Sequence, residues 1–76
     1  MKKRYNIEGI TINPRTRFGK PVLAGTRVPI ELVVGKIAGG MAVEKVMAEY
    51  DLTKKQVLTA LRYAAKIIAS EDVAVV

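Results

Sequence analysis

A nine-residue segment near the N-terminus, Gly19–Arg27, constrains the fold more than any other part of the chain. Its two glycines fit positions where the backbone has a positive φ or approaches another segment closely, and its proline fits an edge strand or a turn. The segment therefore predicts a rigid turn rather than a catalytic loop. The residues expected to hold this turn are Gly19, Pro21, Gly25, Thr26 and Arg27.

Two short β segments and a helix are predicted around this turn. Pro21–Leu23 and Arg27–Val28 have the composition of strands, and Ala24–Thr26 would connect them. Pro29 fits the first position of a helix, where its missing N–H leaves no hydrogen bond unmade. Before the turn, Tyr5–Ile7 and Ile10–Ile12 are predicted strands.

Three helices are predicted after the turn, because apolar residues recur there at helical spacing. Gly39-Gly40 would end the first helix. Thr53 and Gln56 have the spacing of a capping box for the third, with Leu52 and Val57 as its hydrophobic staple, and this helix would run to about Ser70. The apolar positions are Ile30, Val33, Val34 and Ile37, then Val43, Val46, Met47 and Tyr50, then Val57, Leu58, Leu61, Ala64, Ala65 and Ile68.

The sequence thus predicts an α+β fold, with short N-terminal β-strands followed by a three-helix, helix-turn-helix-like unit. We expect a single domain over 1–76, divided into a β part over 1–28, a tri-helical unit over 29–70 and a tail over 71–76. A chain of this length buries only about 60% of its unfolded surface, so pairing into a homodimer would stabilise it.

Several kinds of chemistry are excluded by what the chain lacks. It contains no cysteine and no histidine, which rules out disulfides, thiolate chemistry and cysteine-ligated zinc and removes the commonest general base. No serine–base pair, phosphate-cradling glycine loop or metal-ligand cluster is present either. We therefore expect no catalytic residue, no metal and no cofactor, and a protein that is not an enzyme.

The expected location follows from two further absences. No stretch approaches the roughly 20 apolar residues of a membrane span. No signal-peptide pattern follows the basic residues 2–4. The chain is expected to be soluble and cytoplasmic, with no membrane partner.

The net charge of +6 points to a polyanionic partner, with nucleic acid, here duplex DNA, as the first candidate and an acidic protein surface as the second. A short helix, a turn at Asp51–Thr53 and a longer capped helix have the layout of a helix-turn-helix. No acidic residue lies between Asp51 and Glu71, so cations on the open face of the third helix have no acidic neighbours along that helix. The candidate DNA contacts are Lys55, Thr59, Arg62 and Lys66 on one stripe of this helix, with Lys54 beside it and Lys3 and Arg4 in an N-terminal arm.

Alternatives remain open at this stage. In one alternative, the basic stripe is an ordinary solvated helix face, and the chain is a protein-interaction module that does not bind DNA. The turn at Asp51–Thr53 lacks the glycine of a typical helix-turn-helix. The basic stripe also has no Asn or Gln that could form two hydrogen bonds with adenine. Two roles are open for Lys20 and Arg27. In the first, both contact nucleic acid from a β-wing. In the second, Arg27 has a structural role, paired to Glu31 or to a carbonyl, and Lys20 is only solvated.

The motif Gly19-Lys20-Pro21-x-x-x-Gly25-Thr26-Arg27-x-Pro29, preceded by Ile12-Asn13-Pro14, resembles the signature of domain-of-unknown-function family 433. The resemblance runs from about Tyr5 to about Ile68 and includes Ala38-Gly39-Gly40, Leu52-Thr53 and Ala60-Leu61-Arg62-Tyr63-Ala64. These small prokaryotic proteins are similar to VapB-type antitoxins. The resemblance implies a winged or helix-turn-helix (homeodomain-like) fold and a PIN-like nuclease toxin as a partner.

A protein partner has a candidate site near the C-terminus. Residues 71–76 alternate apolar side chains, and such a tail can add a strand to another sheet or fill a groove; a frayed end without a role is the alternative. Because antitoxins of this sort join a DNA-binding part to a toxin-binding segment, a toxin contact is expected at Ile68, Val73 and Val75. The expected role is to restrain the toxin and to repress transcription of its own operon.

Overall fold

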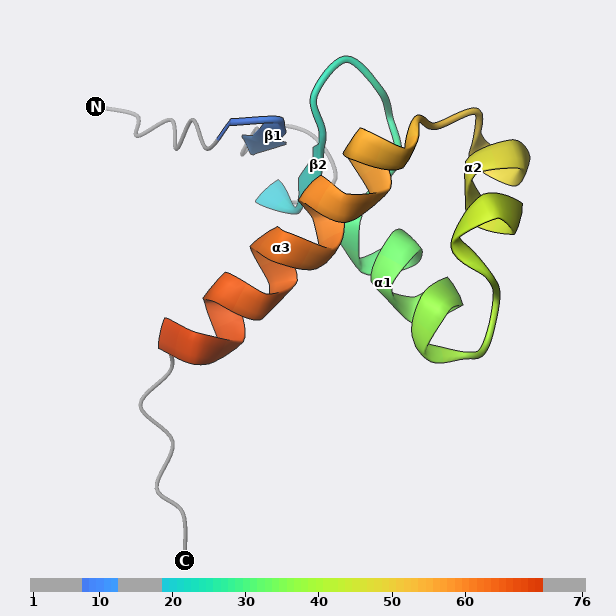
Figure 1. Cartoon of the computed structure of the whole chain (residues 1–76). Helices are drawn as coiled ribbons and strands as arrows, with labels where there is room; N and C mark the ends of the chain where they lie inside the picture. The colour runs from blue at the N-terminus through green and yellow to red at the C-terminus, as the bar shows by residue number, and fades with distance from the viewer. Residues whose placement is uncertain (1–7, 13–18, 71–76) are drawn as a thin grey trace, which may run out of the picture.

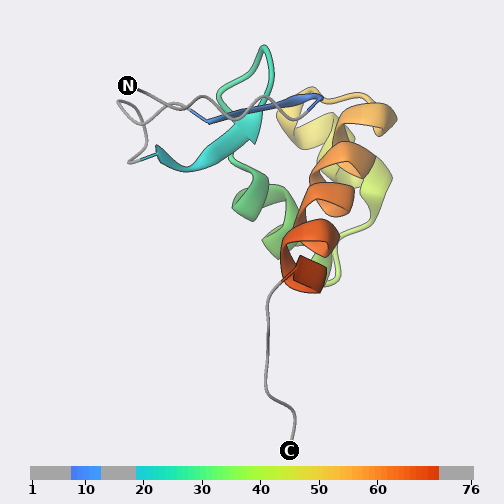
Figure 2. The same cartoon turned by 90° about the vertical axis from the view of Figure 1, so that its left-hand side faces the viewer.

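A two-stranded sheet and three helices make up the computed structural model of the chain, which describes residues 8–12 and 19–70 (Figure 1). The elements are β1 (Ile10–Ile12), β2 (Pro21–Leu23), α1 (Ile30–Ala38), α2 (Val43–Tyr50) and α3 (Lys54–Ser70). The strands pair antiparallel, with Ile10 opposite Leu23 and Ile12 opposite Pro21. Figure 2 shows the strands to one side of the helices. The expected α+β class is confirmed, and the predicted strand at 5–7 lies outside the described residues.

The turn after β2 has the conformation that its glycines indicate. The backbone φ is 78° at Gly25, within this turn, and 75° at Gly19, just before β2. A Cβ atom at Gly25 would meet nothing within 4 Å, so the glycine is needed for its φ and not for space. Thr26 closes the turn: its Oγ1 donates to the Leu23 carbonyl at 2.8 Å and accepts from the Val28 N–H at 3.0 Å.

The residues just before α1 differ from the prediction. Arg27–Val28 is not a strand, because the extended chain there makes a single backbone–backbone hydrogen bond, from the Leu23 N–H to the Val28 carbonyl, and one isolated bridge, from Val22 to Pro29. Pro29 is the residue before the helix and not its first residue, since its ψ of 146° is extended. Its carbonyl accepts the first helical hydrogen bonds, from the N–H groups of Leu32 and Val33.

The ends of the helices follow the local signals. Gly39 ends α1 and Gly40 follows with a φ of 106°. Asp51 ends α2 in the left-handed conformation (φ 55°), so it takes the place that glycine has in many such turns. The capping box of α3 is confirmed: the Gln56 N–H donates to Thr53 Oγ1 at 3.1 Å, and the Thr53 N–H donates to Gln56 Oε1 at 2.8 Å.

All the helices and strands contribute to one apolar core. Its buried members are Ile10, Leu23, Ile30, Val33, Val46, Leu52, Val57 and Ala60. The apolar stripes predicted for α1 and α2 face it, because the residues of each stripe are buried or half-buried.

The prediction for α3 is only partly right. Val57 is buried, but the other buried residue of this helix is Ala60, which the predicted apolar face omitted. Leu58, Ala65 and Ile68 are exposed. The reason is that α3 packs near its N-terminal end against the other elements, whereas its last turns extend beyond them in Figure 1.

Candidate nucleic-acid interface

The basic stripe predicted for the third helix lies on one side of α3. Lys55, Thr59, Arg62 and Lys66 all line the same hollow of about 310 Å³ between this helix and the β1 end of the sheet. The three cationic side chains are exposed, and Thr59 is half-buried. The structure therefore brings together four of the seven residues proposed to contact DNA.

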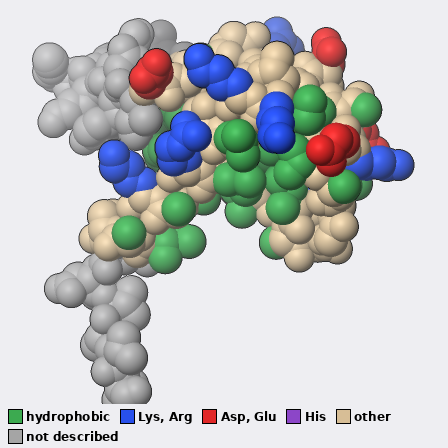
Figure 3. All heavy atoms as spheres, in the orientation of Figure 1, with side chains coloured by type: hydrophobic (Ala, Val, Ile, Leu, Met, Phe, Trp, Pro, Cys, Tyr) green, Lys and Arg blue, Asp and Glu red, His purple; other side chains and the backbone are tan. Residues whose placement is uncertain are grey.

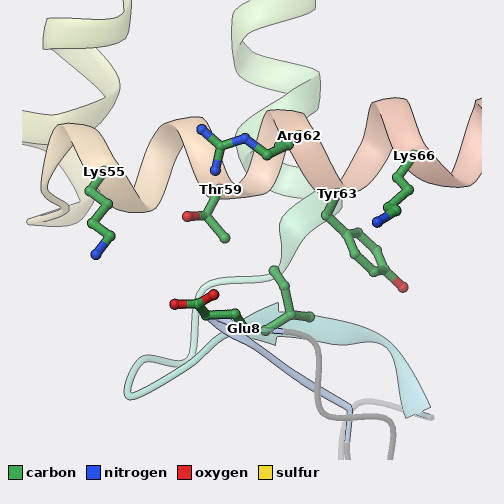
Figure 4. Close-up of a pocket in the computed structure, with 7 residues that line it drawn as sticks. Glu8, Lys55, Thr59, Arg62, Tyr63 and Lys66 are labelled. Atoms are coloured by element: carbon green, nitrogen blue, oxygen red, sulfur yellow. The ribbon is translucent and has the colours of Figure 1, made fainter.

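The opposite wall of this hollow comes from the residues at the start of the sheet. Glu8 and Ile10 line it from below, and Tyr63 lines it from α3. In Figure 4, Lys55, Thr59 and Tyr63 point from the helix toward the strands, and Glu8 lies across from Thr59. The Arg62 side chain instead runs back along the helix, away from Glu8.

The turn before β1 approaches the stripe closely at Thr59. A Cβ atom built on Gly9 would lie 2.9 Å from Cγ2 of Thr59, closer than real Cβ atoms approach, and the φ of Gly9 is +83°. The Gly9 carbonyl accepts a hydrogen bond of 2.9 Å from the Ala24 N–H, which ties this turn to the end of β2. The sequence predicted a stripe that is open along its whole length. The structure differs at Thr59, which is half-buried because Gly9 lies against it.

The charges around the hollow are predominantly positive. Among residues 8–12 and 19–70, the ion pair within 4 Å joins Lys20 to Glu31, so within this part of the chain Lys55, Arg62 and Lys66 have no carboxylate partner at that distance. Glu8 is the single carboxylate in the lining. Three exposed cations on one side of the helix can bind phosphate groups, provided that the phosphates approach from the side away from Glu8.

The other predicted DNA contacts lie elsewhere. Lys54 is exposed at the first turn of α3 but does not line the hollow. Lys3 and Arg4 lie outside the described residues. The helix therefore supplies the candidate interface within the described chain.

The expectations that Arg27 pairs with Glu31 and that Lys20 is only solvated are both wrong. Glu31 pairs with Lys20, whose Nζ lies 3.2 Å from Glu31 Oε2, and not with Arg27. Spacing of four residues brings side chains together only within a helix. Since α1 begins at Ile30, Arg27 lies in extended chain and remains exposed.

A second hollow, of about 280 Å³, lies between the last part of α3, α1 and the start of β2. Ile68, proposed to contact a protein partner, lines it and is 67% exposed. Ile67 and Tyr63 line it with α1 residues Ile30 and Val34. Val73 and Val75, the other proposed partner contacts, lie outside the described residues.

Sequence reasoning missed Glu8 and Tyr63 as neighbours of the basic stripe. Tyr63 follows Thr59 by four residues, so helical spacing alone could have placed it there. Glu8 has no such signal, because it reaches the stripe only through the packing of the sheet on α3. No group of three Asp, Glu, His or Cys side chains in the described part of the chain is placed to hold a metal ion.

These features define a small α+β protein with a basic helix and a two-stranded sheet packed on it. A family model described as "Protein of unknown function (DUF433)" matches residues 10–64, and the chain belongs to this family. Comparison with curated proteins and with solved structures gives no match. Within residues 8–12 and 19–70, no helix has both the length and the apolar character needed to cross a bilayer.

Proposed function

We propose that this chain is an antitoxin-like DNA-binding protein, with α3 as the helix that contacts DNA. One observation carries the proposal: a capped helix of 17 residues presents Lys55, Arg62 and Lys66 on one side and contains no acidic residue. A surface helix usually carries acidic partners at i+4, and their absence favours a polyanion as the partner.

The arrangement of the last two helices supports the same proposal. The short α2, a turn over Asp51–Thr53 and the longer α3 have the order and lengths of a helix-turn-helix, whose second helix enters the major groove. Contacts by Lys55 and Lys66 would be to phosphate and would position the helix. Arg62 carries the one guanidinium on α3, which can donate two hydrogen bonds to guanine.

A titration with duplex DNA at several salt concentrations tests this. Neutralising a phosphate lowers the logarithm of affinity by about 0.9 per tenfold increase in salt, so three contacts per protomer would give a slope of about −2.7. The duplex should include the DNA upstream of the chain's own gene. Absence of binding to any duplex at low salt would remove the proposal.

Charge reversal on α3 separates a specific surface from general attraction. Arg62→Glu with Lys66→Glu should abolish DNA binding by repelling phosphate, and should leave folding nearly unchanged because both side chains are exposed. The matched control is Lys36→Glu with Lys45→Glu, which changes the net charge equally around the α1–α2 connection. Equal loss of affinity in both variants would show that only net charge matters.

The antitoxin role rests on the resemblance noted from the sequence. In this proposal the chain is a cytoplasmic homodimer that binds a PIN-like nuclease, restrains it and represses its own operon. Two-fold symmetry would match the symmetric DNA sites that helix-turn-helix dimers bind. Co-expression with a nuclease encoded next to its gene tests the toxin: the chain should relieve growth arrest, and deletion of residues 73–76 should weaken relief while sparing DNA binding.

A protein-interaction module that does not bind DNA is the second candidate. The observation that favours it is that exposed large apolar side chains gather on α3, where Ile68 is 67% exposed. If the variant with Glu at 62 and 66 still relieves growth arrest and the unmodified chain binds no duplex, this second function is the correct one.

A further inference from the structure

A second stripe on α3 is apolar and exposed. Within the described residues, the exposed large hydrophobic side chains are Leu58, Ile67 and Ile68, and all three belong to this helix. Two of them lie on a line with Leu61 and Ala65. The members of this apolar seam, Leu58, Leu61, Ala65 and Ile68, are separated by three, four and three residues.

This spacing is that of the a and d positions of a coiled coil, which form a narrow contact line along a helix. At about 100° per residue, the four side chains fall within about 80° of one another. Leu61 is half-buried, and Leu58 and Ile68 are 39% and 67% exposed. The seam is about 15 Å long at 1.5 Å per residue, enough for a few turns of a partner helix.

The two edges of the seam differ in character. On one edge, Val57 and Ala64 pack toward the body of the protein. On the other edge, Lys55 and Arg62 occupy the e positions, where coiled-coil partners form ion pairs. Figure 3 shows hydrophobic side chains on the face that carries α3, with Lys and Arg side chains along their upper edge.

Charge decides which helix can cover this seam. In an antiparallel pair of α3 helices the e positions of both copies meet, so Lys55 and Arg62 of one copy would face the same cations of the other and repel them. Lys54 continues the seam at its N-terminal end, and α3 has no acidic residue to compensate. With a net charge of +6 on each chain, a second copy is disfavoured here.

We propose that the apolar seam of α3 binds an acidic amphipathic helix of a partner protein. Leucine-sized side chains of the partner lie along Leu58, Leu61, Ala65 and Ile68, and its carboxylates lie opposite Lys55 and Arg62. The inference goes beyond DNA binding and does not depend on it; any dimer of this chain would use another surface.

Two labelled peptides of about three heptads each test the proposal by fluorescence anisotropy with the full chain. Both peptides have Leu at a and d, and one has Glu and the other Lys at e and g. We expect the Glu peptide to bind and the Lys peptide not to bind. Leu58→Gln or Ile68→Gln should lower affinity for the Glu peptide about tenfold, because each removes one buried apolar side chain from the complex.

Ile67→Gln is the matched control, since Ile67 is 42% exposed on the same helix but lies off the seam. It should leave affinity for the Glu peptide unchanged, and circular dichroism should show all three variants folded. Equal losses from Ile67→Gln and Ile68→Gln, or equal binding of both peptides, would overturn the proposal. So would a dimer of the chain alone that Leu58→Gln dissociates.

The outcome is separable from that of the DNA proposal. Leu58→Gln and Ile68→Gln keep every cation, so they should leave the salt-dependent binding of duplex DNA unchanged. A chain that binds the Glu peptide but no duplex supports the seam alone. A chain that binds duplex but not the Glu peptide supports only the basic stripe.

Discussion

Replacing Gly9 with alanine tests how closely the turn before β1 approaches the basic stripe of α3 at Thr59. Gly9 has a φ of +83°, and a Cβ atom there would lie 2.9 Å from Thr59 Cγ2. Gly25→Ala provides the reference, because Gly25 has a similar φ of +78° and nothing within 4 Å of the added atom. The two substitutions share the backbone cost and differ in the overlap with α3.

The magnitudes follow from these geometries. An L-residue in the left-handed region costs about 1–2 kcal/mol, and the reduced entropy of the unfolded chain offsets about 0.4–1 kcal/mol of that. Gly25→Ala should therefore destabilise by about 1 kcal/mol. Overlap with a packed neighbour adds about 1–3 kcal/mol, and Thr59 limits the relief because it has only two favoured rotamers in a helix. We expect about 2–4 kcal/mol for Gly9→Ala.

Urea unfolding followed by circular dichroism measures both costs. Stability of about 4–11 kcal/mol is typical for 76 residues, at 0.05–0.15 kcal/mol per residue, so at the middle of this range both variants remain folded in water. Thr59→Ala removes the Cγ2 and Oγ1 atoms that alanine at position 9 would meet. In that background the cost of Gly9→Ala should fall to within about 0.5 kcal/mol of the cost of Gly25→Ala.

Two results would refute this reasoning. If Gly9→Ala and Gly25→Ala lower the free energy of unfolding equally in the unmodified chain, the turn before β1 does not pack closely against Thr59. If Thr59→Ala gives no relief, the cost at Gly9 arises from the backbone alone. Either result would also mean that the basic stripe is more open than the structure shows.

Substitutions at three other positions test the elements that position the helix. Thr53→Ala should lower the free energy of unfolding by about 1 kcal/mol, measured by urea unfolding, because the Gln56 N–H loses its acceptor. Thr53→Ser keeps a hydroxyl acceptor and should therefore keep most of the stability that the cap provides. Glu31→Gln should change the melting temperature little, since its ion pair with Lys20 is exposed and such pairs contribute about 0–1 kcal/mol; a large drop would show a role beyond this pair. Leu23→Ala should cost about 2–5 kcal/mol in the same urea assay, because Leu23 is 1% exposed; a loss below 1 kcal/mol would contradict its place in the core.

Features that depend on neighbours in the sequence were predictable. The capping box of Thr53 and Gln56, the glycine end of α1 and the positive φ of Gly25 each arise from interactions within a few residues. The same holds for the basic stripe, whose residues share a helix side because of helical periodicity alone. The family resemblance was also visible in the sequence, and the match over residues 10–64 confirms the family.

Features that depend on which segments meet in space were not predictable. The partner of Glu31 is Lys20 and not Arg27, because extended chain before α1 removes the helical spacing that the sequence suggested. The place of Gly9 on Thr59, and of Glu8 beside the basic stripe, follows from how the sheet packs on α3.

The division of the apolar residues of α3 shows the same limit most clearly. The sequence by itself determined that this helix would be capped, basic on one side and apolar over a broad face. Only the tertiary structure decided that Val57 and Ala60 are buried while Leu58 and Ile68 remain exposed. Periodicity specifies which residues share a face, but burial depends on where the other elements lie, and they cover only the part of that face that they reach.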